Sequence, residues 1–378
     1  MTSLTFDVWG LVTDLFNCVL CILVVLVCSY RYKVPVTYTV GLIISCVVPF
    51  LLNDVLFSAD YMPDQFRYFE SVKAIRSFDF NSVDESQSVA VASYFLSVVP
   101  IPFVETIQSL GFFNKLIFLG IFFFLYSKRY VNNSVFIFLL AYPSLLMYSS
   151  LSLRDTLIFL LMFISFYNAI NGRFFYSIIF LLPLVFIKFQ NFFIQGSFLL
   201  VYLLMGVRRK GISLKNITYI FSALMVIVLF SAPLVIPLIN KYRFDMWQED
   251  GGFEYELADI SGVGDFLVTG TLNGFYFLLK PFPWGAQNIL QLIQSVENIV
   301  VVAFISYITY TCFRYDKQRT FFWLSFLIGS SLIYGLVVFN FGAAARYRFP
   351  FIAIYVIFVV HDVFYGPMSK GRREIRSR

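Results

Sequence analysis

Arg154 and Asp155 are two adjacent charged residues inside an apolar run that extends from Ser134 to Tyr167. A charge in such a run is costly unless it faces a water-filled cavity or a membrane surface, so it favours a functional site. The pair also divides the run into two segments, each close to the ~20 residues that cross a bilayer. We therefore expect a turn at one membrane surface, where Arg154 either presents its positive charge to an anionic ligand or pairs with Asp155.

Basic residues at other helix ends and short turns could join Arg154 at the same membrane face. Lys188, Arg346 and Arg348 are placed in this way. The planar guanidinium of arginine binds phosphate oxygens through two parallel hydrogen bonds, so such residues suit a pyrophosphate group. Pairing with a nearby acid is the alternative for each of them. The long polar segments add four candidates for substrate binding: Arg67, Arg243, Lys280 and Trp284.

Carboxylates could supply a general base to the same site. Asp64 and Glu256 are the candidates for taking a proton from an attacking hydroxyl, and Asp155 is a third acid of the site. The segments around Asp64 and Glu256 contain many acids, so a solvated side chain is the alternative for both. The chain has a single histidine, His361, and no phosphate-binding glycine loop or dinucleotide fingerprint. This disfavours histidine-based acyl transfer, histidine-ligated metals and ATP-driven transport, and we expect neither a metal nor a cofactor.

Membrane helices are the elements that must position these residues. The chain is 59% hydrophobic and only 13% charged, and apolar segments recur along its length, which indicates an all-α polytopic membrane protein. We predict one integral-membrane domain, 1–378, with about 11 transmembrane helices, external loops at about 58–108 and 239–288, and a tail at 366–378. The expected spans are 8–29, 37–57, 109–127, 133–151, 155–171, 174–189, 191–207, 217–238, 289–313, 320–340 and 349–365.

Basic residues in the remaining short loops predict the orientation. Arg31, Lys128, Arg173 and Arg314 belong to alternate loops, and lysine and arginine are enriched in cytoplasmic loops. The pattern places the N-terminus outside and the C-terminus in the cytoplasm, where the basic tail would contact anionic lipid head groups. It also accounts for most of the net charge of +6, so we expect membrane lipids, and no nucleic acid, as partners.

Three short motifs bear a family resemblance. They are Ser152-Leu-Arg154-Asp155, Pro281-Phe-Pro-Trp284 and Ala345-Arg346-Tyr-Arg348-Phe-Pro350. With them, the chain resembles the bacterial O-antigen polymerases, which are Wzy-type polymerases of oligosaccharide repeat units. The resemblance extends over most of the chain through its size, its number of spans, its 48 phenylalanines and its two long loops.

The resemblance implies a GT-C-like fold and a metal-independent membrane glycosyltransferase in the bacterial inner membrane. Such an enzyme joins undecaprenyl-pyrophosphate-linked repeat units at the periplasmic face into the O-antigen of lipopolysaccharide or a related surface polysaccharide. Its partners would be the lipid-linked oligosaccharides and a protein that regulates chain length. Two alternatives stay open: a flippase, which would need charges near the bilayer midplane and repeated halves, and an O-antigen ligase.

Overall fold

A computed structural model of the protein describes residues 8–53, 55–204, 214–249 and 257–365. These residues form helices and connecting turns, and no β-strand occurs among them. By its internal contacts the chain divides into two compact units, Met1–Gly196 and Ser197–Arg378, which are described one at a time.

Four helices are long and apolar enough to cross a membrane: Val8–Tyr32, Ser109–Ser127, Ile289–Tyr315 and Phe341–Tyr365. Shorter apolar helices accompany them, at Val36–Leu52, Asp155–Ile170, Phe174–Ile187, Phe189–Leu203 and Val263–Leu279. The prediction of an all-α membrane protein is therefore confirmed at this level, because helices satisfy their own backbone groups in a bilayer and single strands do not.

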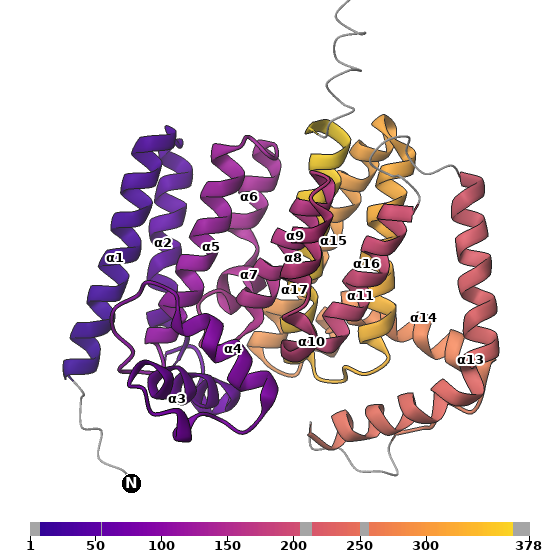
Figure 1. Ribbon diagram of the computed structural model, residues 1–378, viewed down its shortest axis with the longest axis horizontal. Coiled ribbons are helices and arrows are strands. Elements are labelled where there is room, and N and C mark those ends of the chain that lie inside the picture. Colours follow the sequence, from indigo (N-terminus) through magenta and orange to yellow (C-terminus); the bar gives the residue numbers. More distant parts are fainter. Residues whose placement is uncertain (1–7, 54, 205–213, 250–256, 366–378) are drawn as a thin grey trace, which may run out of the picture. The chain divides into compact units, whose positions relative to one another are not determined.

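In the first unit, α1, α2, α5, α6 and α8 run side by side, and α3 and α4 lie across one end of this bundle (Figure 1). The longer helices are α1 (Val8–Tyr32), α2 (Val36–Leu52), α5 (Ser109–Ser127) and α8 (Asp155–Ile170), and α11 (Phe189–Leu204) begins in this unit and ends in the second. The shorter ones are α3 (Asp64–Arg76), α4 (Gln87–Ser97), α6 (Asn133–Ala141), α7 (Pro143–Tyr148), α9 (Phe174–Leu181) and α10 (Leu184–Ile187). We refer to the end that carries α3 and α4 as the α3–α4 end.

Two expected single spans are each divided in two. The run 133–151 becomes α6 and α7, separated at Pro143, and the run 174–189 becomes α9 and α10, separated at Pro183. Proline lacks the backbone N–H that continues a helix, and it disfavours helical geometry in the residue before it. Both breaks therefore follow from the position of a proline within an apolar run.

The first long loop is itself folded. Two 3₁₀ turns, Ala59–Tyr61 and Phe80–Ser82, flank α3, and α4 follows. Arg76 at the end of α3 donates from Nε and Nη2 to the Ser97 carbonyl oxygen at the end of α4, at 3.1 and 3.0 Å. Burial lowers the pKa of Arg76. This cation satisfies the carbonyl end of α4 and holds the two helices together.

The basic residues used to predict orientation gather at the opposite end of this unit. Arg31 lies in the last turn of α1, Lys128 follows α5, and Arg173 lies between α8 and α9. Figure 1 places these three helix ends away from α3 and α4. The α3–α4 end is therefore the one without this group of loop cations.

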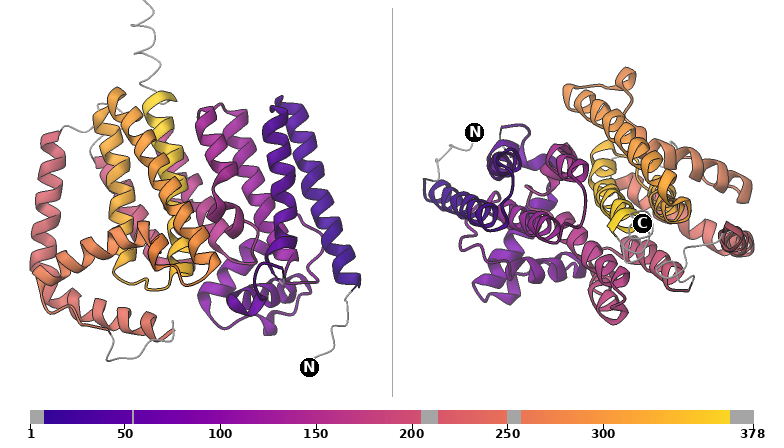
Figure 2. Two further views of the ribbon diagram at one scale, coloured as in Figure 1. Left: turned by 180° about the vertical axis from the view of Figure 1, so that it is seen from behind. Right: turned by 90° about the horizontal axis from the view of Figure 1, so that it is seen from above.

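The second unit contains α13 (Leu214–Glu249), α14 (Val263–Leu279), α15 (Ile289–Tyr315), α16 (Lys317–Gly335) and α17 (Phe341–Val360), which continues as a π-helical turn, His361–Tyr365. α13 contains Pro233 and Pro237 and bends sharply (Figure 2). The segment 239–288, expected as a loop, contains the end of α13 and all of α14. α14 packs on α16 where Gly274 and Gly335 meet, and a Cβ at Gly335 would overlap the backbone of α14.

Candidate functional site

A buried, non-helical turn joins α7 to α8 at the α3–α4 end of the first unit. It comprises Ser149 to Arg154, and its first five residues are fully buried. Thr156 in the first turn of α8 donates from Oγ1 to the Tyr148 carbonyl oxygen at 3.1 Å, which closes the turn on itself. The turn predicted from the charged pair therefore exists, and Arg154 and Asp155 lie where it enters α8.

α3 covers this turn. Gln65 accepts a hydrogen bond at Oε1 from the Ser152 backbone N–H at 3.3 Å, and it also exchanges two hydrogen bonds of 3.1 Å with Asn53. The next turn of α3 carries Tyr68, which is 1% exposed and lies against Arg154. The loop preceding α5 thus forms a folded cover over the place where α8 begins.

Arg154 has two hydrogen-bond donors without an acceptor. Its guanidinium carbon lies 5.8 Å from the centre of the Tyr68 ring, in a cation–π contact. Nε and Nη1 are buried, and none of the described residues accepts a hydrogen bond from either atom. Buried donors are nearly always paired, and guanidinium stays charged at any ordinary pH. The arrangement suits an anionic group that enters beside the ring, and the N-terminus of α8 adds its own positive potential there.

Asp155 is the first residue of α8 and is 2% exposed. A carboxylate in the first turn of a helix is favoured by the helix dipole. The helix N-terminus therefore explains why a buried carboxylate can follow Arg154 directly. The side chain therefore contributes to the local charge balance of the site as well as to the start of α8.

Asp64 and Arg67 lie together on α3. Arg67 donates to the Asp84 carboxylate from Nε at 2.8 Å and from Nη2 at 3.0 Å, and its Nη1 lies 4.0 Å from Asp64. The hydrogen bond from Arg67 lowers the pKa of Asp84, and the same bond raises the pKa of Arg67. Arg67 therefore pairs with a nearby acid, because two of its guanidinium nitrogens donate to Asp84. Asp64 begins the helix and is partly exposed.

Lys188 lies between α10 and α11 and is partly buried. α10 packs against α4 and α8, so Lys188 belongs to the same α3–α4 end as Arg154 (Figure 1). The structure therefore brings Asp64, Arg67, Arg154, Asp155 and Lys188 to one end of the first unit. The remaining candidates among the described residues lie in the second unit.

Arg348 is buried in the second unit and caps a helix. Its Nη1 donates to the carbonyl oxygens of Phe277 and Leu278 at 3.1 and 3.2 Å, and its Nη2 donates to the Asn298 side-chain oxygen. Asn298 in turn donates to the Lys280 carbonyl oxygen at 2.9 Å. These are the last carbonyl groups of α14, where a cation is favoured by the helix dipole. Arg348 therefore positions the segment that follows α14.

That segment carries Lys280 and Trp284. Lys280 Nζ lies 3.7 Å from the centre of the Tyr276 ring, and Phe282 and Trp284 stack with centroids 5.0 Å apart. Trp284 is 84% exposed. Stacked exposed rings suit either a sugar face or a membrane interface. Arg346 lies one turn into α17, partly buried, with its guanidinium 5.7 Å from the Tyr347 ring.

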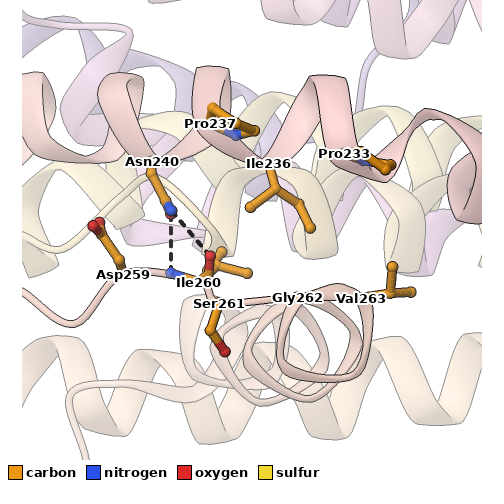
Figure 3. Close-up of a pocket in the computed structure, with 9 residues that line it drawn as sticks. All are labelled: Pro233, Ile236, Pro237, Asn240, Asp259, Ile260, Ser261, Gly262 and Val263. Carbon is orange, nitrogen blue, oxygen red and sulfur yellow. Dashed lines mark hydrogen bonds between the residues drawn. The ribbon is translucent and has the colours of Figure 1, made fainter.

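Arg243 connects α13 to two other segments of the second unit. It is 4% exposed and donates to the carbonyl oxygens of Leu336 and Ala258 at 3.1 and 3.2 Å. Beside it lies a pocket of about 600 Å³ between α13 and the segment 259–263 (Figure 3). Asn240 fixes this segment by exchanging hydrogen bonds of 3.0 and 3.1 Å with the Ile260 backbone. Glu256 lies outside the described residues.

Sequence reasoning missed four residues around these sites: Tyr68, Asn114, Lys115 and Asn298. Asn114 and Lys115 lie in α5, and both are fully buried and hydrogen-bonded to the α7–α8 turn. The available signal was their polarity inside apolar runs, because polar side chains within membrane helices are expensive and mark functional regions.

No protein-family description, curated protein or solved structure matches this chain. The class that the fold defines is an all-helical membrane protein. Its most distinctive feature in the first unit is a buried turn that ends in a cation with two unpaired donors.

Proposed function

We propose that the protein is a metal-independent membrane glycosyltransferase that polymerises undecaprenyl-pyrophosphate-linked oligosaccharide repeat units into O-antigen or a related surface polysaccharide. The observation that supports this most directly is Arg154, whose buried Nε and Nη1 receive no acceptor from the described residues. A pyrophosphate offers several charged oxygens on two phosphorus atoms, so Nε and Nη1, which point along different edges of the guanidinium, can each donate to one of them.

The reaction makes one glycosidic bond and breaks one. A hydroxyl of the acceptor sugar attacks the anomeric carbon of the growing glycan, the bond from that carbon to the lipid pyrophosphate oxygen breaks, and the hydroxyl proton passes to a carboxylate base. Negative charge builds on the departing pyrophosphate, and fixed cations stabilise it as it forms. Arg154 would carry that role, with Lys188 at the same end of the unit.

The remaining candidates take supporting roles in this proposal. Asp64 and Glu256 are the candidate bases, and Asp64 is favoured among described residues because it lies on α3, the helix that covers the Arg154 turn. Within the second unit, Trp284 and its stacked neighbour Phe282 would hold a sugar ring, and Lys280 and Arg346 would contact polar groups of that sugar. Arg348 and Arg243 would act by fixing the segments on which those residues stand.

The proposed topology has about eleven spans in a GT-C-like arrangement. The N-terminus and the α3–α4 end would face the periplasm, and the C-terminus would lie in the cytoplasm of a bacterial inner-membrane protein. The gathering of Arg31, Lys128 and Arg173 at the other end of the first unit supports this orientation, since such cations favour the cytoplasm. A chain-length regulator would be the protein partner.

Surface glycolipid from cells that lack the gene tests this proposal on a gel. We expect the polymer ladder to disappear while a single repeat unit remains attached to the lipid core. Loss of every repeat, including the first, would contradict a polymerase and indicate a flippase or a ligase. Those two are then separated by whether the lipid-linked intermediate accumulates inside or outside the cytoplasmic membrane.

A further inference from the structure

The α7–α8 turn is buried, so its backbone groups need partners from elsewhere in the protein. One face of α5 supplies several of them. Gly111, Asn114 and Lys115 are spaced three and four residues apart, which places them on the same side of a helix, and all three contact the turn. α5 therefore determines the conformation of a segment nearly 40 residues further along the chain.

Asn114 makes the most informative of these contacts. Its Nδ2 donates to the Leu151 carbonyl oxygen at 2.6 Å and to the Leu153 carbonyl oxygen at 2.7 Å. Both amide hydrogens are thus used, and the side chain is fully buried. Leu153 immediately precedes Arg154, so the second bond fixes the peptide group from which Arg154 departs.

The other two residues of this face act at the beginning of the turn. Lys115 donates from Nζ to Ser149 Oγ at 3.1 Å. Gly111 lets the helix approach the Ser150 carbonyl oxygen so closely that a Cβ at this position would overlap it. The turn is therefore held at its first residues and again just before Arg154.

We infer that Asn114 is a positioning residue for Arg154: by holding the Leu151 and Leu153 carbonyl groups, it fixes the direction in which the unpaired guanidinium donors point. The inference rests on the proposed role of Arg154 as the substrate-binding cation. A misplacement of about 1 Å at such a group lowers a rate by about 100-fold. Asn114→Ala should therefore impair turnover without removing any group that touches substrate.

Asn17 in α1 provides a matched control. It is also fully buried, its Nδ2 donates to the Phe103 carbonyl oxygen at 3.0 Å, and its Oδ1, like that of Asn114, accepts no hydrogen bond from the described residues. N17A therefore removes a similar buried amide from the same unit without touching the α7–α8 turn. N17A therefore measures how far the loss of any buried amide in this unit lowers the rate.

The first test compares N114A and N17A, each in the wild-type and R154K backgrounds, by the rate at which purified protein extends a synthetic lipid-linked repeat unit. We expect N114A to lower kcat by about 100-fold with Arg154 present and to add no more than about twofold to R154K. N17A should change the rate by the same factor in both backgrounds. An N114A effect of equal size in both backgrounds would overturn the inference.

The second test needs no enzymatic activity. The thiol introduced by R154C is labelled with a methanethiosulfonate reagent, and the labelling rate is measured. The background rate of the native cysteines is measured on the same protein without R154C and is subtracted. We expect N114A to change this rate severalfold and N17A to leave it unchanged. Equal rates in the N114A and parent proteins would refute the positioning role, whereas a failed polymerase assay with wild-type protein would refute only the proposed function.

Discussion

Replacement of Arg154 by alanine should abolish polymer synthesis without weakening the fold. Two hydrogen bonds to a charged group contribute about 1.5–3 kcal/mol each, so the two unpaired donors could supply about 3–6 kcal/mol to a pyrophosphate leaving group. At about 1.4 kcal/mol per factor of ten, the loss corresponds to about 10²–10⁴-fold in rate. R154K keeps the charge but has one donor nitrogen in place of two separated ones, so it should retain a small part of the activity.

The stability of the same variant separates a functional cation from a structural one. R154A removes two buried donors that bond to no described residue, which favours the folded state, and it also removes the cation–π contact with Tyr68, which stabilises by about 0.5–2 kcal/mol. The two effects oppose each other, so the unfolding temperature should change little. The assay is thermal unfolding of the detergent-solubilised protein, with polymer length measured on the same variants in cells.

Arg173→Ala is the control for loss of charge. Arg173 is exposed beyond the far end of α8, so its replacement should change neither polymer length nor unfolding temperature. Polymer of wild-type length from R154A, or a large fall in the unfolding temperature of R154A, would refute the reasoning.

Three further predictions concern stability. G111A should lower the free energy of unfolding by about 1–3 kcal/mol, because its Cβ meets a backbone oxygen of the α7–α8 turn. G120A is the control on the same helix: its Cβ meets nothing within 4 Å, so the substitution should be neutral or slightly stabilising. The hydrogen bond from Arg67 lowers the pKa of Asp84 in the folded protein. The ionised carboxylate therefore adds under about 1 kcal/mol to the free energy of unfolding. This contribution is present above the ordinary pKa of 3.8 and is lost as the pH falls through the lowered pKa. The excess stability of wild type over D84N should therefore vanish at low pH in unfolding measurements, and a constant excess would contradict the assignment. R348M should destabilise the protein by about 1–3 kcal/mol, since it leaves the last carbonyl groups of α14 without their donor, and an unchanged unfolding temperature would argue against the cap.

The sequence was sufficient to predict the class of fold and the most distinctive turn. Long apolar runs can hardly be anything other than membrane helices, and a charged pair inside one of them must lie at a turn or a polar site. Arg154 and Asp155 accordingly lie where α8 begins. Local chemistry of this kind is visible in the sequence because it depends on neighbours along the chain.

The missed features depend on residues far apart in the sequence. Nothing near Asn114 indicates that its amide reaches the carbonyl of Leu153, and nothing near Arg348 indicates that it caps α14. The expected external loop 239–288 contains α14, whose 17 residues include Gly270 and Gly274. Those glycines allow close packing on α16, an advantage that only the tertiary structure reveals.

The proposed function requires this protein to join lipid-linked repeat units by itself. The most direct measurement reconstitutes the purified protein in lipid vesicles with one synthetic undecaprenyl-pyrophosphate-linked repeat unit and follows the products by mass spectrometry. We expect glycans of two or more repeats, with one undecaprenyl pyrophosphate released for each glycosidic bond formed. R154A should give neither product. Recovery of the unchanged single repeat from the wild-type protein would contradict the assignment.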